Sequence, residues 1–169
     1  MYELRARYHL RIGKRAGLLA LLGMRSRDGG EGVISLAVAL FISTPYAIDG
    51  DTVVIERERV RLVQIDTPEL GTCCAKEARR FTQQFMEGEG AVKLERDPVL
   101  DNKDGYGRQL RYLIKGGRNL NLELVRGGYA KPMFYNKVKG KYADLIEKYA
   151  RNAEAKRLGV WNCKGKVEQ

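Results

Sequence analysis

Short apolar stretches rich in β-branched residues recur through the middle of the chain and predict β-strands. Residues 52–55 and 60–65 form the first two, separated by a short charged stretch. Residues 91–95 and 109–114 form two more, and the second of these ends near a Gly-Gly pair, a common strand terminator. The central part of the chain is therefore expected to build a small sheet.

Apolar residues spaced three and four positions apart predict three helices. The first covers residues 72–87, where Thr72 can act as the N-cap. The second is short and begins at the potential cap Asn119, and the third covers residues 141–158. Strands first and helices late, with one helix inserted between strands, predict an α+β fold that contains a small barrel.

The N-terminal part of the chain has a different character. Residues 1–34 are basic and contain several glycines near their end, and we expect them to form an extension. Residues 33–42 form an apolar run that is too short to cross a bilayer as a helix. This run fits two alternatives, a buried first strand or the core of a signal peptide. A signal peptide would fit especially well if translation began at Met24. Residues 164–169 are expected to be a C-terminal tail.

The chain of 169 residues is basic, with 31 Lys and Arg against 21 Asp and Glu and a formal net charge of +10. This length suits a single domain with its own core. A surface with this charge favours polyanionic partners, with nucleic acid ahead of an anionic membrane. A solvated cationic face is the alternative, because charge alone does not identify a partner.

Three cysteines, Cys73, Cys74 and Cys163, and one histidine, His9, limit the metal and disulfide chemistry. The lack of a Cys-x-x-Cys pair and the position of His9 in the extension argue against a structural zinc site. The adjacent Cys73 and Cys74 cannot easily bridge to each other, but one of them could pair with Cys163 in an oxidising compartment. The alternative is three reduced cysteines, so the pairing stays open.

Three polar clusters stand out, at residues 48–52, 61–69 and 104–108. The first contains Asp-Gly-Asp, the second ends in Asp-Thr-Pro-Glu, and the third reads Asp-Gly-Tyr-Gly-Arg. Taken alone, each has a plain structural explanation: a turn, a capped helix start and a glycine-rich connection. Together they supply what phosphodiester cleavage requires, namely neutralised phosphate charge, a positioned water and a stabilised leaving oxygen.

Oxygen ligands in the first two clusters suit a hard cation. Asp51, Asp66 and the main-chain carbonyl of Thr67 could hold Ca²⁺. Glu69 is a third carboxylate, which can orient or deprotonate the attacking water. We expect these four residues to form the metal and water part of a hydrolytic site.

Two arginines complete the predicted site. Arg61 and Arg108 can form paired hydrogen bonds with phosphate oxygens and stabilise the charge that grows in the transition state. Nuclease chemistry based on histidine is disfavoured, because His9 lies in the expected extension. Strict strand alternation puts Arg61 and Asp66 on opposite faces, so the strand must twist or bulge between them, or the site must straddle its end.

The order of these clusters resembles that of the staphylococcal nuclease (thermonuclease) family. The shared sequence is Asp-Gly-Asp-Thr, then Arg-(x)4-Asp-Thr-Pro-Glu, then Asp-x-Tyr-Gly-Arg. The similarity continues through residues 121–131 and residues 159–161, so that it covers roughly residues 40–163. It implies a nuclease domain over residues 35–163, with a five-stranded OB-type β-barrel and three α-helices.

The resemblance also implies an activity, the Ca²⁺-dependent hydrolysis of single-stranded DNA and RNA to products with 3′-phosphates. It assigns the same roles to the acids and arginines named above. It further places Asp49 behind the metal ligands and Tyr106 beside the nucleotide. A base-stacking tyrosine of the family corresponds to Phe134, or to Tyr135 after a shift of one residue, and either ring could stack on any base. Core packing is the alternative role for both rings.

Two departures from the family pattern concern substrate binding. Gly105 replaces a lysine, which removes one phosphate contact. The loop after Glu69 is shorter than in the best-known member and contains Cys73 and Cys74. We therefore expect this chain to bind its substrate differently.

Two other functions compete with an active nuclease. A non-catalytic nucleic-acid-binding or protein-interaction module could use the same barrel, but it has no need of three carboxylates that repel an anion when no metal is bound. A structural surface protein with a lipid-binding basic tail would explain only residues 1–42. A monomer is expected, with membrane association only through the N-terminal segment. The habit of the family favours export or a cell-surface location, and the cytoplasm is the alternative.

Overall fold

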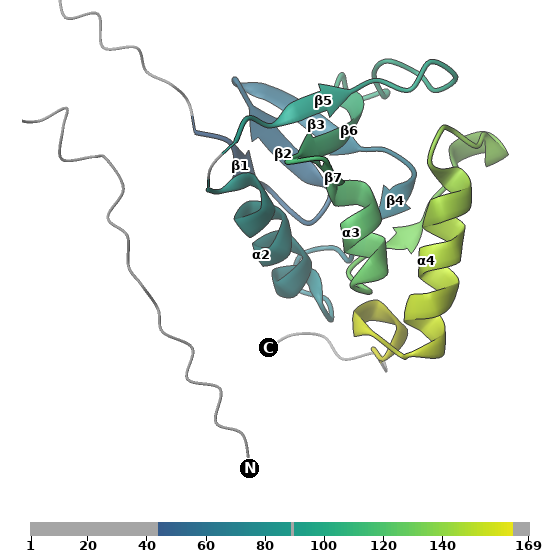
Figure 1. Ribbon diagram of the computed structural model, residues 1–169. Coiled ribbons are helices and arrows are strands. Elements are labelled where there is room, and N and C mark those ends of the chain that lie inside the picture. The colour runs from purple at the N-terminus through teal and green to yellow at the C-terminus, as the bar shows by residue number, and fades with distance from the viewer. Residues whose placement is uncertain (1–43, 89, 164–169) are drawn as a thin grey trace, which may run out of the picture. The chain divides into compact units, whose positions relative to one another are not determined.

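The computed structural model describes residues 44–88 and 90–163 as a mixed sheet packed against three α-helices (Figure 1). The strands are β1 Tyr46–Ala47, β2 Thr52–Ile55, β3 Glu58–Leu62, β4 Ile65–Asp66, β5 Lys93–Glu95, β6 Gln109–Lys115, β7 Arg118–Asn119 and β8 Lys131–Pro132. The α-helices are α2 Ala75–Met86, α3 Leu120–Arg126 and α4 Ala143–Ala155, and the 3₁₀ helices are η2 Tyr135–Lys137 and η3 Gly159–Trp161. Within these ranges every helix is too short or too polar to cross a membrane. The apolar run at residues 33–42, the extension and the tail lie outside the described residues.

The main sheet follows the order β1-β2-β3-β6-β5, and β7 also pairs with β6. Neighbouring strands are antiparallel except β3 and β6, which are parallel. In that parallel pair Val60 lies opposite Gln109. Because Arg108 directly precedes Gln109, the third polar cluster is placed beside the strand that carries Arg61.

The predicted α+β class with three helices is confirmed, but the predicted closure of five strands into a barrel is not observed. In the described residues the sheet ends at β1 and β5, and these two edges do not pair with each other. β4 leaves the main sheet and pairs with β8 in a separate two-stranded sheet. The edge strands contain only two and three residues, so they offer few backbone groups for closure.

Helix ends differ in part from the prediction. α2 begins at Ala75, because the Thr72 hydroxyl donates to a preceding carbonyl (2.6 Å) and Cys74 takes the N-cap position with a left-handed φ of 70°. α4 is shorter than predicted at both ends. α3 begins after Asn119 as predicted, and the Asn119 side chain accepts a hydrogen bond from the Leu122 N–H (3.3 Å).

The core forms where the sheet meets the helices. Figure 1 shows α3 between α2 and α4, and α3 packs against both neighbours. Almost fully buried aliphatic side chains fill the space between strands and helices: Val53, Val60, Leu62, Leu113, Leu120, Leu124 and Ile146. Burial of one such side chain contributes about 1.5–3 kcal/mol to folding. The polar clusters lie at the ends of strands that this core holds in place.

One buried amide connects α3 to two strands near the polar clusters. The Asn121 side chain is fully buried. Its Oδ1 accepts a hydrogen bond from the Leu113 N–H (3.2 Å), and its Nδ2 donates to the Val63 carbonyl (2.8 Å). Asn121 therefore satisfies two buried backbone groups, one in β6 and one just after β3.

Asn121→Leu is expected to lower the free energy of unfolding by about 2–4 kcal/mol, because it leaves two buried backbone groups without partners. Urea denaturation followed by circular dichroism measures the effect. Asn152→Ala, at an exposed position on α4, is the matched control and should change the free energy of unfolding by less than about 0.5 kcal/mol. Equal stability of the two variants would contradict the role given to these hydrogen bonds.

Candidate active site

The loop between β1 and β2 is a tight turn that fixes the first acidic cluster. Asp49 Oδ1 accepts hydrogen bonds from the main-chain N–H groups of Asp51 (3.1 Å) and Thr52 (2.6 Å). A Cβ atom at Gly50 would lie 2.7 Å from the Thr67 side chain, so glycine is required for this close approach. Asp49 thus shapes the turn that presents Asp51.

Asp51 is a buried carboxylate, with only 4% of its surface exposed. Its Oδ2 accepts a hydrogen bond from the Thr67 N–H (2.7 Å) and forms an ion pair with Arg61 Nη1. The Thr52 hydroxyl donates a longer hydrogen bond to Oδ1 (3.3 Å). Burial raises the pKa of Asp51 to about 6, although the Arg61 charge and the Thr67 N–H oppose the rise. On balance, the fold therefore disfavours the ionised form of this acid.

A break in the strand explains how Arg61 and Asp66 reach the same side. Gln64, which has a left-handed φ of 63°, divides the predicted strand over residues 60–65 into β3 and β4. Across this break, Arg61 Nη2 lies 2.9 Å from Asp66 Oδ1. Of the alternatives that strand alternation left open, the structure shows the one in which the site straddles the end of the strand.

Hydrogen bonds of Gln64 hold the break in place. Its side chain donates to the Val138 carbonyl (3.2 Å), and its main-chain carbonyl accepts from the Met133 N–H (3.0 Å). The buried Tyr112 hydroxyl lies 2.9 Å from Gln64 Oε1 and 2.9 Å from Asp97 Oδ2. The left-handed residue is thus fixed through both its side chain and its main chain.

Arg61 lies between two acids that differ in exposure. Its own side chain is 13% exposed and that of Asp66 is 54% exposed, whereas Asp51 is buried. Arg61 Nη1 is buried and in close electrostatic contact with Asp51, but this contact lacks hydrogen-bond geometry, and Nη1 has no other hydrogen-bond partner in the described residues. One guanidinium group therefore gathers two of the predicted metal ligands.

The loop after β4 carries Thr67 and Glu69. Thr67 is buried beside Asp51, to which its N–H donates. The Glu69 side chain is exposed, and its carboxylate makes no hydrogen bond or ion pair with another described residue. Its main-chain carbonyl accepts hydrogen bonds from the Thr72 N–H (3.0 Å) and hydroxyl (2.6 Å). The structure thus brings Thr67 to Asp51 and leaves the Glu69 carboxylate open to solvent, two residues further along the same loop.

Arg108 is held by Asp104, a residue to which the sequence motif alone assigned no role. Asp104 Oδ1 accepts from the N–H groups of Tyr106 and Arg108 (both 3.0 Å), and Oδ2 accepts from Arg108 Nε (2.6 Å). The Nη groups of Arg108 make no hydrogen bond or ion pair with other described residues. Burial raises the pKa of Asp104, but the hydrogen bonds from Arg108 and Tyr106 outweigh burial and hold that pKa below its usual value. An Asp at the start of a glycine-containing turn often makes such main-chain contacts, which is the signal that points to Asp104.

The three aromatic candidates differ in exposure. Tyr106 is 88% exposed, and the Arg108 guanidinium lies 5.4 Å from its ring centroid. Tyr135 is 73% exposed. Phe134 is partly buried against the core, with Lys139 Nζ 5.7 Å from its ring centroid. Tyr106 and Tyr135 therefore offer open ring faces, while Phe134 already packs against the core.

Known proteins are similar to this chain in sequence. The family model described as Staphylococcal nuclease homologue matches residues 59–163. The chain belongs to the staphylococcal nuclease family. It is 37% identical to the thermonuclease of Staphylococcus intermedius over 124 residues, which cover 68% of this chain and 71% of that protein. It is 31% identical to the thermonuclease of Staphylococcus hyicus over 125 residues, which cover 68% of this chain and 72% of that protein.

A third relative is less similar in sequence. The SPbeta prophage-derived endonuclease YokF of Bacillus subtilis (strain 168) is 29% identical over 136 residues, which cover 75% of this chain and 45% of that protein. The family resemblance expected from the three polar clusters is confirmed by these matches. The matched range of the family model contains Arg61, Asp66 and Arg108, while the turn with Asp51 precedes it.

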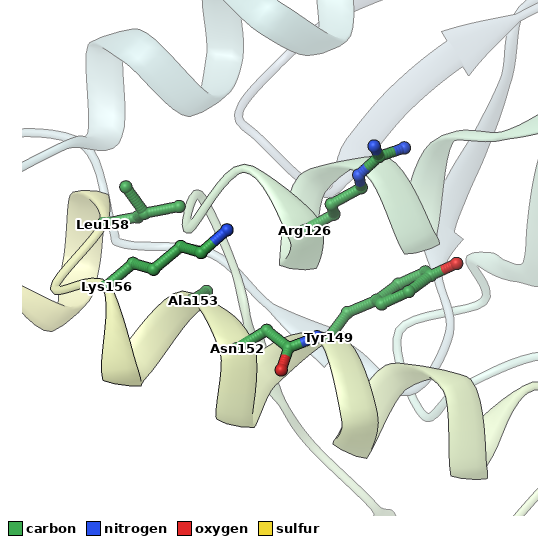
Figure 2. Close-up of a pocket in the computed structure, with 6 residues that line it drawn as sticks. All are labelled: Arg126, Tyr149, Asn152, Ala153, Lys156 and Leu158. Atoms are coloured by element: carbon green, nitrogen blue, oxygen red, sulfur yellow. The ribbon is translucent and has the colours of Figure 1, made fainter.

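The structure also contains a pocket that lies apart from the acidic cluster. It has a volume of about 420 Å³ and lies between α3 and α4 (Figure 2). Its lining residues are Arg126, Tyr149, Asn152, Ala153, Lys156 and Leu158. None of the predicted catalytic or metal-binding residues lines it.

Asp51→Asn is expected to raise the free energy of unfolding at pH 8 by up to about 3 kcal/mol. The folded-state pKa of about 6 lies above the unfolded value of 3.8, so the folded protein binds this proton more tightly. The charge on Asp51 therefore costs stability as the pH rises from about 4 to about 6, and the full cost remains above that window. The stabilising effect of the variant should accordingly shrink toward zero near pH 4.

Urea denaturation at several pH values between 4 and 8 tests this expectation, with Asp101→Asn at an exposed position as the control. The control should show no comparable dependence on pH. A loss of stability in Asp51→Asn at pH 8 would show that the ion pair with Arg61 outweighs the cost of burial.

Proposed function

We propose that this chain is a Ca²⁺-dependent endonuclease that hydrolyses single-stranded DNA and RNA and leaves 3′-phosphates. The observation that carries the proposal is the guanidinium of Arg61, which gathers the buried Asp51 and the exposed Asp66 at the end of β3. Relatives named thermonuclease and endonuclease support the same class of enzyme, a nuclease of the staphylococcal nuclease family.

The oxygen groups at the end of β3 fit a hard cation. The carboxylates of Asp51 and Asp66 share one arginine, and Thr67, which follows Asp66, contributes a main-chain carbonyl. All three are oxygen ligands of the kind that Ca²⁺ prefers. The chemistry that a bound Ca²⁺ supplies is neutralisation of phosphate charge and polarisation of the phosphate oxygens.

The two arginines bind the scissile phosphate and stabilise the charge that develops on it. Asp104 holds Arg108 through Nε, so the two Nη groups can form paired hydrogen bonds with phosphate oxygens. Arg61 is restrained by Asp51 and Asp66, which limits the rotamers available to its side chain. Restrained donors of this kind favour the transition state, because they need little reorganisation during the reaction.

Glu69 orients the attacking water and accepts its proton. Its carboxylate is exposed and uncommitted within the described residues, and its main chain is fixed by Thr72. A carboxylate in this state is free to accept a hydrogen bond from water, as a general base must. Attack on the phosphorus with departure of the 5′-oxygen yields the 3′-phosphate product.

Exposed rings support binding of unpaired bases. Tyr106 and Tyr135 present open faces, and stacking on an aromatic ring depends little on the identity of the base. Such rings suit single strands, whose bases are accessible. Gly105 offers no side chain to the phosphates, so binding is expected to depend more on the two arginines.

Cleavage of denatured DNA and of RNA is expected with millimolar Ca²⁺ and should be lost when a chelator is added. Arg108→Ala should lower kcat by about 100- to 1,000-fold, because one transition-state donor group is removed. Arg151→Ala, at an exposed position on α4, is the charge-matched control and should keep wild-type activity. Wild-type cleavage no faster than that of Arg108→Ala would overturn the proposal and favour the non-catalytic nucleic-acid-binding module.

Asp104→Ala is expected to lower kcat by about 10- to 100-fold, because it releases Arg108 from its fixed position. In the double variant with Arg108→Ala the loss should be no larger than for Arg108→Ala alone, since both changes remove the same contribution. Single-turnover cleavage of a labelled oligonucleotide measures these rates. Additive losses would mean that Asp104 acts in another way than by positioning Arg108.

A further inference from the structure

The sulfur atoms of all three cysteines of the sequence meet next to the start of α2. Cys73 and Cys163 form a disulfide, with their Cα atoms 5.9 Å apart. The Sγ of Cys74 lies 3.2 Å from the Sγ of Cys163 and 3.5 Å from that of Cys73. The three sulfur atoms lie within 4.8 Å of one another and are partly buried. The proposed nuclease chemistry uses none of them.

Backbone contacts place both sides of this cluster without help from the disulfide. On one side, the Ala75 N–H donates to the Thr72 carbonyl (3.2 Å) and the Ala78 N–H to the Cys74 carbonyl (2.9 Å), which fixes the first turn of α2. On the other side, the Val160 N–H donates to the Gly128 carbonyl (2.8 Å) and anchors η3 against the end of α3. The sulfur atoms are therefore expected to stay close together when the disulfide is reduced.

The position of Cys74 favours joint binding of one ion by the three cysteines over disulfide exchange. In an exchange, the attacking sulfur must approach along the axis of the bond that it breaks. Cys74 Sγ is almost equally distant from the other two sulfur atoms, so it lies beside the bond. Once the disulfide is reduced, three sulfur atoms this close together can serve as ligands of a single ion.

The distances also suit a thiophilic ion. With metal–sulfur bonds of about 2.3 Å, the sulfur ligands of a tetrahedral site lie about 3.8 Å apart. The distances from the Cys74 sulfur to the other two, 3.5 and 3.2 Å, are somewhat shorter than that value, so small side-chain movements after reduction would reach it. Thiolate ligands select Zn²⁺, Cd²⁺ or Cu⁺ over the hard cations that carboxylates prefer. The start of α2 also favours negative charge, as the positive end of the helix dipole.

We propose that the reduced protein binds one thiophilic ion through Cys73, Cys74 and Cys163. A dithiol reductant supplies two electrons and two protons to the disulfide, which becomes two thiols, and the dithiol is oxidised to its own disulfide. Binding of a divalent ion by the three thiols then releases three protons and forms three metal–sulfur bonds. The sequence spacing argued against a zinc site, but the fold brings Cys163 to the adjacent pair and supplies the third ligand.

The bound ion replaces the disulfide as a link between two distant parts of the chain. Cys73 follows the loop that carries Glu69, and Cys163 follows η3. The loop thus stays attached to the C-terminal end of the described residues in the oxidised form and in the metal-bound form. This site is separate from the oxygen ligands Asp51 and Asp66 in both position and chemistry.

Cadmium titration of the full chain tests the proposal. The protein is reduced with dithiothreitol, freed of reductant without oxygen, and titrated with Cd²⁺ in millimolar Ca²⁺, which competes for carboxylate ligands. One Cd²⁺ per chain is expected, together with a sulfur-to-cadmium charge-transfer absorption band and protection of three thiols from a thiol reagent. The oxidised protein should show no such band. Near-ultraviolet circular dichroism checks that the reduced protein remains folded.

Two variants separate the possible results. Cys74→Ser can still form the Cys73–Cys163 disulfide when oxidised, but its reduced form should bind Cd²⁺ at least about 100-fold more weakly, because a direct ligand is lost. Asp66→Asn is the matched control and should keep the charge-transfer band. Equal Cd²⁺ affinity in Cys74→Ser and wild type would overturn the proposal. The absence of the charge-transfer band from the reduced wild-type protein would also overturn it, as would unfolding of that protein in the presence of Cd²⁺. Ca²⁺-dependent cleavage of nucleic acid by the oxidised protein is measured separately. A failure of Cd²⁺ binding can therefore be distinguished from a failure of the proposed nuclease activity.

Discussion

The carboxylate of Asp51 draws its partners from segments that are far apart along the chain. The turn before β2 presents the carboxylate, β3 supplies the guanidinium of Arg61, and the loop after β4 supplies the N–H of Thr67. A buried carboxylate without such partners is strongly unfavourable. The fold can therefore bury this one charge only if the three segments come together. The close approach of Gly50 to Thr67 is part of the same requirement.

The parallel pairing of β3 with β6 extends this arrangement to the second arginine. It places the start of β6, and with it Arg108, beside the strand that carries Arg61. The two arginines are restrained differently: Arg61 meets acids with both of its Nη groups, whereas Asp104 holds Arg108 through Nε. Under the proposed function, phosphate oxygens at Arg61 compete with Asp51 and Asp66, whereas at Arg108 they meet open donors. The two groups are thus suited to different parts of phosphate binding.

Local signals allowed much of the fold to be predicted, and long-range contacts decided the rest. The cap at Asn119 was visible in the sequence, because an N-cap acts on residues only three positions away. Strand alternation also showed that Arg61 and Asp66 could not lie on the same face of one regular strand. The break that brings them together depends on Gln64, whose left-handed φ is held by partners more than 40 residues away. The open sheet could not be foreseen for the same reason. Which cysteine of the adjacent pair bonds to Cys163 also depends on the packing of the last helix and η3.

The loop that carries Glu69 has little core of its own, since Glu69 and Leu70 are both exposed. It is held at one end by the hydrogen bond from Thr67 to Asp51, and at the other by the hydrogen bonds from Thr72 to the Glu69 carbonyl and by the disulfide at Cys73. The disulfide joins residues 90 positions apart, and restriction of the unfolded chain by a loop of this length contributes about 4–5 kcal/mol to stability. Burial of Asp51 acts in the opposite direction, because each unit by which its pKa is raised costs about 1.4 kcal/mol when the group is ionised. The stabilisation from the disulfide thus more than offsets the cost of the buried Asp51 charge. The disulfide also restrains the loop that contains Thr67, and a shift of Thr67 would leave Asp51 without its N–H donor.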